Sequence, residues 1–481
     1  MERGASGMAQ AIDWKTIEEW NDKYVVRTFY SQGEYHWIPV ESTDGDYLVM
    51  PDGTRLLDFF NQLYCVNVGQ KNPRVTERIK EALDRYGFVW DLYTTDYKAT
   101  VAKLIVEDIL GPYDWAGKIR FTNAGSESVE VAGMIARLVS GKPLIASREH
   151  GYHGETAGAA ALNHVYPGRS HMSDGARSDF VRGVPGQAHA NTFACPAPFC
   201  YRCSIGHTYP ECTTRGSQLP CVLATERMIL TQGVDQVAAI ITEPACGAGT
   251  IVPPDEYLPQ IHEMTRRLGI LWIVDEVLMG FGRLGTWFGH QKYGADLKPD
   301  IMTIAKGITS SQIPAGGVVV NREIAAFMDS VRWNHVSTFA GHPIAMAAAQ
   351  ANIEYMIEND IPEMSRKAGE YFGAELRELE KKHKTIGLVA GAGMFWQVEL
   401  VKDKETREPF IPEDRYTAFA GDTSKNPTGI VLGKCLEKGV LLGGYMPNTL
   451  RIGASLTVSK ADMDKAIDAL DHALDHLDTF A

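Results

Sequence analysis

The chain has 481 residues, of which 44% are hydrophobic and 22% are charged, and this is the composition of an ordinary globular protein. Its formal net charge of −13 at pH 7 makes it a poor candidate for binding nucleic acid or an anionic membrane surface. No stretch approaches the roughly 18 to 20 apolar residues of a membrane span, and residues 1–20 lack the basic start and apolar run of a signal peptide. We therefore expect a cytoplasmic protein that binds neither nucleic acid nor membranes.

Three regions follow one another along the chain. Residues 1–70 are mixed, with a short strand expected at 47–50 between two turns that contain Asp and Gly. From about 71 to 332, short apolar runs alternate with helical stretches, which predicts βα units and an α/β fold with a mostly parallel sheet. Residues 333–481 carry the C-terminal helices and turns. Three apolar runs without polar alternation are expected to be strands covered by helices on both faces: 237–241, 270–274 and 301–305.

Two helices are readable from their apolar spacing. After Gly125 and Ser126, apolar residues recur at the i, i+3, i+4 spacing of one helix face until Gly141 ends the helix. Near the C-terminus, Ser459 and Asp462 have the spacing of a capping box in front of a second apolar stripe. Both stripes predict packing against the core and not a binding surface.

Two polar residues directly follow predicted strands. Asp275 follows the run 270–274, and Lys306 follows the run 301–305. Each residue alone is typical of a capping side chain or a surface charge. Because the two end consecutive strands, we expect one βα unit between them and both side chains at the carboxyl edge of the sheet, where α/β proteins bind ligands.

A carboxylate and an amine placed in this way suit pyridoxal phosphate. The amine can form a Schiff base with the aldehyde of the cofactor, and the carboxylate can keep the pyridine nitrogen protonated so that the ring accepts electrons. The phosphate needs backbone N–H groups, and the segment 122–126 leads from a strand expected at 118–121 into the helix that begins near Ser126. A Gly-Ser pair at a helix start is otherwise an ordinary N-cap.

Several motifs, in the same order along the chain, resemble those of class III aminotransferases of fold type I. They are DEVLMGFGRLG at 275–285, Lys306-Gly307 with PAGG at 314–317, Glu243-Pro244 followed by Gly247 and Gly249, and TFAGHP at 338–343. The resemblance covers nearly the whole chain. It implies a large domain at about 71–332 with a mostly parallel seven-stranded sheet, and a smaller α+β domain formed by 1–70 and 333–481.

The resemblance also implies roles for individual residues. Lys306 would carry the cofactor and shuttle a proton, and Asp275 would pair with the pyridine nitrogen. The other cofactor contacts would come from Gly125 and Ser126 at the phosphate, from Tyr152 and Val277 on the two faces of the ring, and from His153 and Glu243 close by. Thr338 would reach the phosphate of the neighbouring subunit's cofactor, so the resemblance implies a homodimer with shared active sites.

The substrate side is less well defined. Arg451 matches a family position at which an arginine often binds the substrate carboxylate, and its planar guanidinium suits a carboxylate or a sulfonate. A surface arginine in a loop is an open alternative. Trp90 and Phe59, with the adjacent Phe60, could wall the substrate pocket, although aromatic residues at such positions are more often core.

Five of the eight cysteines crowd into the segment 195–221. Cys195, Cys200, Cys203 and Cys212 could bind zinc through their thiolates. Only one Cys-x2-Cys pair is present, whereas regular zinc ribbons have two, and this favours free thiols without a metal. A similar Cys-Tyr-Arg-Cys insertion occurs in family members that resemble taurine–pyruvate and related ω-amino acid aminotransferases.

The sequence therefore predicts a pyridoxal-phosphate-dependent transaminase. It would move an amino group from an ω-amino acid, an aminosulfonate or a primary amine to a 2-oxo acid, with pyruvate as the favoured acceptor. Two alternatives stay open: an aminomutase or decarboxylase of the same fold, and a non-catalytic zinc-dependent binding protein built around the cysteines.

Overall fold

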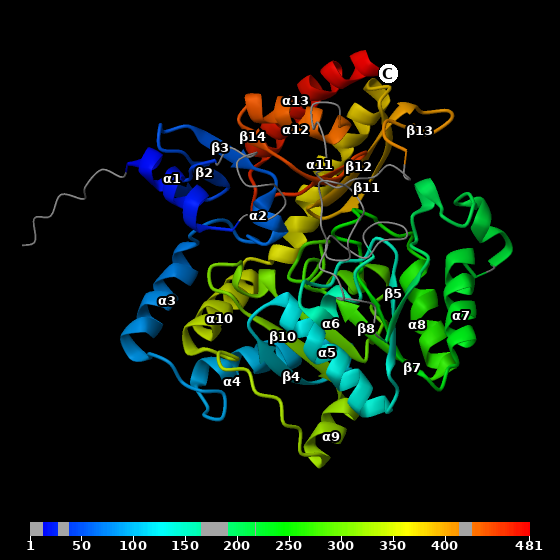
Figure 1. Ribbon diagram of the computed structural model, residues 1–481. Coiled ribbons are helices and arrows are strands. Elements are labelled where there is room, and N and C mark those ends of the chain that lie inside the picture. Colours follow the sequence, from blue (N-terminus) through cyan, green and yellow to red (C-terminus); the bar gives the residue numbers. More distant parts are fainter. Residues whose placement is uncertain (1–12, 27–37, 165–190, 217, 413–425) are drawn as a thin grey trace, which may run out of the picture.

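In the computed structural model, which describes residues 13–26, 38–164, 191–216, 218–412 and 426–481, the largest element is a seven-stranded sheet (Figure 1). Its strands follow the order β4-β10-β9-β8-β7-β5-β6. Their bounds are β4 (Ala116–Thr122), β5 (Leu144–Arg148), β6 (Thr192–Cys195), β7 (Val237–Thr242), β8 (Leu271–Asp275), β9 (Ile301–Ile304) and β10 (Gly316–Asn321). Strand β10 is antiparallel to both of its neighbours and every other pair is parallel, so the predicted mostly parallel sheet is confirmed.

The central strands are buried on both faces because successive side chains of a strand point to opposite sides of a sheet. On one face, Ile240 and Trp272 pack in the same cluster as side chains of helices α7 (Pro220–Gln232) and α8 (Tyr257–Leu268). On the other face, Ile241 and Ile273 pack with side chains of α5 (Gly125–Ser140) and α9 (Arg322–Ser330). The absence of polar alternation in these runs therefore predicted their two-sided cover correctly.

Both helix ends read from the sequence are confirmed. Helix α5 begins at Gly125 and is followed by Gly141, whose φ of 70° lies in the left-handed region that glycine enters easily. Helix α13 (Lys460–Leu477) is preceded by Ser459, whose hydroxyl accepts a hydrogen bond from the backbone N of Asp462 at 3.1 Å. This bond satisfies one of the N–H groups that a helix start leaves without a partner.

The predicted βα unit between β8 and β9 is wrong. Residues 276–300 contain turns and the short 3₁₀ helix η5 (Gly289–Tyr293), but no α-helix. The buried carboxylate of Glu276 ties this segment together, because it accepts hydrogen bonds from the backbone N of Gly289 at 2.8 Å and of His290 at 2.9 Å. Strands β8 and β9 nevertheless lie side by side and parallel.

Two smaller sheets lie at the other side of the molecule (Figure 1). The first has the order β1 (Ser42–Asp44), β2 (Tyr47–Val49), β3 (Arg55–Asp58) and β14 (Val440–Leu441). The second is antiparallel and contains β11 (Ile386–Ala392), β12 (Phe395–Asp403), β16 (Thr449–Ile452) and β15 (Gly443–Met446), with β13 (Glu408–Pro409) paired to β12. Because β3 pairs with β14, Leu57 lies opposite Val440. This pairing supports our proposal that residues 1–70 and 333–481 form one smaller domain.

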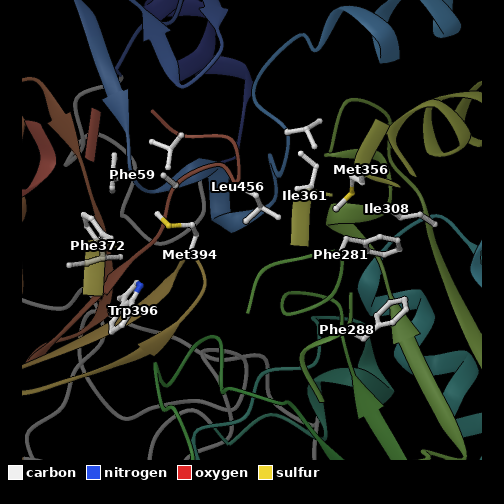
Figure 2. Packing of buried hydrophobic residues seen from close by; sticks show 14 of the residues in the cluster. Phe59, Phe281, Phe288, Ile308, Met356, Ile361, Phe372, Met394, Trp396 and Leu456 are labelled. Carbon is white, nitrogen blue, oxygen red and sulfur yellow. The ribbon is translucent and has the colours of Figure 1, made fainter. Parts of the chain in front are cut away.

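One hydrophobic cluster joins the large sheet to the smaller ones (Figure 2). Phe281 and Phe288, from the connection after β8, lie on one side of it with their ring centroids 5.4 Å apart. Phe372 and Trp396 lie on the other side, and Leu456 lies between the two groups. This shared core positions strand β16 with respect to the carboxyl edge of the large sheet.

The other α-helices of the described residues complete the layers around these sheets. They are α1 (Trp14–Tyr24), α3 (Pro73–Arg85), α4 (Asp96–Lys103), α6 (Ala157–Ala160), α10 (Pro343–Glu358), α11 (Ile361–Lys382) and α12 (Pro427–Glu437). The short element α2 (Asn61–Tyr64) is a single turn in which all four residues have a positive φ. Across the part of the chain that the structure describes, no helix combines the length and the apolar character needed to cross a membrane.

Candidate active site

The carboxylate of Asp275 is held in one orientation at the end of β8. Its Oδ1 accepts hydrogen bonds from the hydroxyl of Thr303 at 2.9 Å and from the backbone N of Val277 at 3.1 Å. Its Oδ2 lies 2.7 Å from Nδ1 of His153. Asp275 and His153 are both buried. A carboxylate removed from water in this way attracts a cationic ring nitrogen more strongly than an exposed one would.

Lys306 begins the short 3₁₀ helix η6 (Lys306–Thr309) directly after β9, and its φ of 44° is left-handed. Burial lowers the pKa of its amine below the usual value, and the positive charge of Arg451 acts in the same direction. Cys65, Asp275 and Glu243 oppose this lowering of the pKa. A lowered pKa leaves more of the amine neutral, and the neutral amine is the form that acts as nucleophile and base.

The register of the large sheet brings these two residues to the same edge. Asp275 is paired with Thr303 of β9, and Lys306 follows Thr303 by three positions. The hydroxyl of Thr303 also donates to Asp275, so the strand that leads to the amine orients the carboxylate. Parallel strands end at the same edge of a sheet, which is where open α/β folds bind their ligands.

The N-terminus of α5 forms a narrow cradle beside this edge. A Cβ placed on Gly125 would lie 2.7 Å from Cγ1 of Val277, so only glycine leaves room there. The hydroxyl of Ser126 accepts a hydrogen bond from the backbone N of Glu155 at 3.2 Å. No side chain caps this helix from Ala124, the residue before it. Backbone N–H groups at such a helix start can bind a phosphate.

Glu243 organises the loops around the cradle. Its buried carboxylate accepts hydrogen bonds from the backbone N of Tyr152 at 3.2 Å and from the backbone N of Gly247 at 2.7 Å. The guanidinium of the buried Arg148 donates to the backbone carbonyl of Glu243 at 2.6 Å. Glu243 therefore connects the loop that carries Tyr152 with the loop that carries Gly247.

These residues fit pyridoxal phosphate. A buried carboxylate, a partly buried amine with a lowered pKa and a helix start with no room for a Cβ at Gly125 lie at one edge of the sheet. Val277 belongs to the segment directly after Asp275 and touches the cradle at Gly125. The roles of the individual residues toward the cofactor remain our proposals.

Arg451 is brought into the same region on strand β16. It is buried, its Nη1 donates to the backbone carbonyl of Gly247, and its guanidinium lies 4.4 Å from the ring centroid of Tyr64. The hydroxyl of Tyr64 donates to the backbone carbonyl of Arg451. The alternative that Arg451 is a surface residue in a loop is therefore wrong.

The other predicted substrate residues and Thr338 differ in their exposure. Phe59 has no exposed surface and its ring packs on Phe372 at a centroid distance of 5.5 Å, so the prediction that it walls a pocket is corrected. The neighbouring Phe60 is only partly buried and packs edge-on against Tyr64. Trp90 is 38% exposed and Thr338 is exposed. The role of Thr338 toward a neighbouring subunit stays a prediction.

The zinc site that the spacing of the cysteines left open stays an open alternative, because Cys203, Cys212 and Cys221 all lie close enough to Cys200 to affect its pKa. Burial raises the pKa of Cys200 and of Cys221 to about 12, and nearby thiols add to the effect. Within the described residues, no three cysteines bring their sulfur atoms within 4.8 Å of one another. The group that meets this distance is His383 with Asp471 and Asp475, and Lys382 already forms an ion pair with Asp471.

Sequence reasoning missed three residues of this region. Thr303 is the one polar residue in the run 301–305, and this interruption was the signal that could have identified it. Tyr64 and Cys65 had no comparable signal, because their segment gave no regular pattern. Cys65 lies close enough to Lys306 to affect the pKa of its amine.

Comparison with known proteins identifies what the chain is similar to. The family described as aminotransferase class-III matches residues 29–474. Putrescine–pyruvate aminotransferase of Pseudomonas aeruginosa is 32% identical over 449 residues, which are 91% of this chain and 90% of that protein.

Solved structures give the same result. An S-selective transaminase from Bacillus megaterium is 53% identical, with a TM-score of 0.91 and coverage of 97% of this chain and 99% of that chain. A taurine:2-oxoglutarate aminotransferase from Bifidobacterium kashiwanohense, in complex with PLP and glutamate, is 28% identical, with a TM-score of 0.85 and coverage of 97% and 98%.

Proposed function

The chain belongs to the class-III aminotransferases, and we propose that it transfers the amino group of a primary amine or ω-amino compound to pyruvate. It is a pyridoxal-phosphate-dependent aminotransferase of fold type I. The observation that carries the proposal is the pair of Asp275 and Lys306 at the ends of adjacent parallel strands, with the charge of Arg451 close to the amine.

The residues at the sheet edge are assigned to different parts of the cofactor. Pyridoxal phosphate supplies an aldehyde that bonds to amines and a ring that takes up negative charge. We assign Lys306 to tether it and Asp275 to hold a proton on its ring nitrogen. We assign the N–H groups at Gly125 and Ser126 to its phosphate, and Tyr152 and Val277 to the two faces of its ring.

The amine of Lys306 is suited to move the proton of the reaction. Burial lowers its pKa, so a larger fraction of Nζ is neutral and able to accept a proton from the donor carbon than in an exposed lysine. A positioned base of this kind contributes about 10² to 10⁴ in rate. Asp275 stays beside the ring through its bonds to Thr303 and Val277 and does not need to move.

Arg451 supports a carboxylate-bearing acceptor. A planar guanidinium can bind both oxygens of a carboxylate, and its contacts with Tyr64 and Gly247 limit the directions in which it can turn. The name of one similar protein, a putrescine–pyruvate aminotransferase, supports a primary amine as donor and pyruvate as acceptor.

We also propose that the enzyme is a homodimer. Large apolar side chains are exposed on two segments of the surface: Leu83, Phe88, Trp90, Leu92 and Tyr93 in the first, and Val336 and Phe339 in the second. Phe88 and Phe339 contact each other at a centroid distance of 5.8 Å, so the two segments form one patch next to Thr338. A patch of this kind is typical of an interface, and a second copy would cover it.

A panel of amino donors and acceptors tests the proposed reaction. The purified holoenzyme is incubated with 1-phenylethylamine, putrescine, β-alanine or taurine, each with pyruvate or 2-oxoglutarate, and both products are quantified. We expect alanine from pyruvate in amounts equal to the carbonyl product, and neither product with Lys306→Ala.

The product balance also separates the alternatives. An aminomutase would form no separate carbonyl product, and a decarboxylase would release carbon dioxide. Membership of an enzyme family already excludes the non-catalytic zinc-binding protein. If no donor yields alanine from pyruvate, pyruvate is not the acceptor and this part of the proposal is overturned.

A further inference from the structure

Arg283 is a fully buried cation in the connection after β8. Its Nη2 donates to Oδ1 of Asn61 at 2.9 Å, to the carbonyl of Tyr64 at 3.2 Å and to Oδ1 of Asn67 at 3.0 Å. Its Nη1 donates to the carbonyl of Ala454 at 2.5 Å and to the carbonyl of Met394 at 3.2 Å. Every one of these acceptors is neutral.

A buried cation with only neutral acceptors is costly, because the loss of hydration is balanced by hydrogen bonds alone. Burial lowers the pKa of Arg283 to about 10, which still leaves the guanidinium charged at neutral pH. The five acceptors come from three separate parts of the chain. Arg283 therefore joins the segment 61–67 to the ends of β12 and β16.

The segment that Arg283 holds has an unusual backbone. Asn61, Gln62, Leu63 and Tyr64 have φ values of 48°, 46°, 69° and 60°, all in the left-handed region. Single residues other than glycine visit this region rarely, and four in succession carry a steric cost at each position. Such a turn persists only where the surroundings hold it in place, and two of the bonds of Arg283 end on its first and last residues.

The turn leads directly to Arg451. The hydroxyl of Tyr64 donates to the carbonyl of Arg451, and its ring lies under the guanidinium at 4.4 Å. The ring is enclosed, because a Cβ on Gly453 would lie 3.0 Å from its Cδ1 and a Cβ on Gly443 would lie 2.5 Å from its hydroxyl oxygen. Tyr64 therefore has little freedom to move while Arg451 stays in place.

We propose that Arg283 is a positioning residue for carboxylate recognition, which acts by holding the left-handed turn 61–64 so that Tyr64 supports Arg451. The inference rests on the proposed function, because it assigns the substrate carboxylate to Arg451. The hydrogen bonds of Arg283 end on Asn61, Tyr64, Asn67, Met394 and Ala454, none of which is a predicted cofactor residue. Its effect should therefore be confined to substrates that carry a carboxylate.

The test compares donors with and without a carboxylate in the first half-reaction. The holoenzymes of the native chain, Arg283→Lys and Asn61→Ala are mixed with alanine or with 1-phenylethylamine, and the change in cofactor absorbance is followed at each concentration. Asn61→Ala removes one hydrogen-bond acceptor of Arg283 and keeps the buried arginine. It therefore tests the same inference if Arg283→Lys does not fold. Arg137→Lys is the matched control, because Arg137 also donates to a backbone carbonyl, that of Pro143, but lies at the far end of α5.

Both variants should raise the half-saturating concentration of alanine by about ten- to a hundredfold, the cost of a displacement near 1 Å at a binding group. The values for 1-phenylethylamine, the starting absorbance spectrum and the control should not change. With Tyr64→Phe added, the loss should be smaller than the sum of the two separate effects, because both changes act through one contact chain.

Two results would overturn the inference. One is an equal loss for both donors, which would mean a general structural role for Arg283. The other is an unchanged response to alanine in both variants while Arg451→Ala loses it, which would leave the proposed function intact. If the native enzyme responds to neither donor, the proposed function itself fails.

Discussion

Nδ1 of His153 lies 2.7 Å from Oδ2 of Asp275, and at most 4% of either residue is exposed. The two side chains come from different parts of the chain, since His153 lies in the loop after β5 and Asp275 ends β8. The backbone N of His153 is itself held by Oδ1 of Asn163 at 2.6 Å. The imidazole is therefore a fixed partner that limits the orientations of the carboxylate.

Replacing His153 should weaken catalysis without removing it. His153→Ala removes one hydrogen bond to a charged group, worth about 1.5–3 kcal/mol, so we expect kcat to fall about ten- to a hundredfold. In His153→Asn the side-chain amide can donate from nearly the same place, so part of the activity should return. Equal activity of the two variants, measured as kcat with the absorbance spectrum recorded alongside, would contradict the positioning role.

The contact between Gly125 and Val277 should control affinity for the cofactor. Gly125→Ala places a methyl group 2.7 Å from Cγ1 of Val277, and overpacking of this kind costs about 1–3 kcal/mol. Titration of the apoenzyme with pyridoxal phosphate should show affinity lower by about tenfold or more. Adding Val277→Ala makes room, so the double variant should bind better than additivity predicts. Strictly additive losses would exclude the clash as the cause.

Arg451 should discriminate donors by charge. Arg451→Ala removes a charge-assisted hydrogen bond worth about 1.5–3 kcal/mol, so β-alanine and taurine should lose about ten- to a hundredfold in kcat/KM. Amines without an acidic group should keep their kcat/KM when only their half-reaction with the cofactor is followed. Arg451→Lys keeps the charge but not the planar fork, and should fall between the two. Similar losses for all donors would remove Arg451 from the substrate site.

The lowered pKa of Lys306 should appear in the pH dependence of cofactor attachment. The neutral amine is the reactive form. Its fraction rises with pH, reaches one half at the pKa and levels off above it, and burial lowers this pKa from the ordinary 10.5. The rate at which the apoenzyme incorporates pyridoxal phosphate, trapped by borohydride, should rise with pH around a midpoint below 10.5. Lys306→Ala should incorporate none. A rise centred at the ordinary value would contradict the effect of burial.

Asp58 should make stability depend on pH in mildly acidic solution. Burial raises the pKa of its carboxyl from 3.8 to about 6 in the folded protein. Between these values the folded state keeps a proton that the unfolded state has lost, so the free energy of unfolding falls as pH rises from about 4 to 6, by up to about 3 kcal/mol. Above pH 6 the loss is complete.

An amide at this position removes the titration. The urea midpoint of Asp58→Asn should therefore exceed that of the native chain at pH 7.5, and the difference should shrink toward pH 5. Asp84→Asn is the control, because this carboxylate is exposed. It should leave the urea midpoint unchanged both at pH 7.5 and near pH 5. A difference that grew on acidification would contradict the raised pKa.

Much of the large sheet could be predicted because its signals are local. The runs at 237–241, 270–274 and 301–305 are apolar without alternation, and a strand covered on both faces requires this pattern. Asp275 and Lys306 could be placed at one edge because parallel strands of a sheet end together. The helix from Gly125 could be read from one apolar face and one terminal glycine.

The connection after β8 could not be read in the same way. Its form depends on the buried carboxylate of Glu276, which bonds to backbone N–H groups 13 and 14 residues away. The different burial of Phe59 and Phe60 also depends on contacts with a distant segment. Both are aromatic, and only the packing of Phe372 decides that the first is core.

The amino-acid pattern by itself determined the fold class and the helix start that suits a phosphate, since apolar runs and helix starts are local features. It also placed the carboxylate and the amine at one sheet edge, because parallel strands end together. Only the tertiary structure decided the surroundings of the substrate arginine. Arg283 reaches Asn61 across 222 positions of sequence and holds a left-handed turn that contains no glycine. Contacts that join distant segments leave no periodicity in the chain, so they exist only once the folded core has brought those segments together.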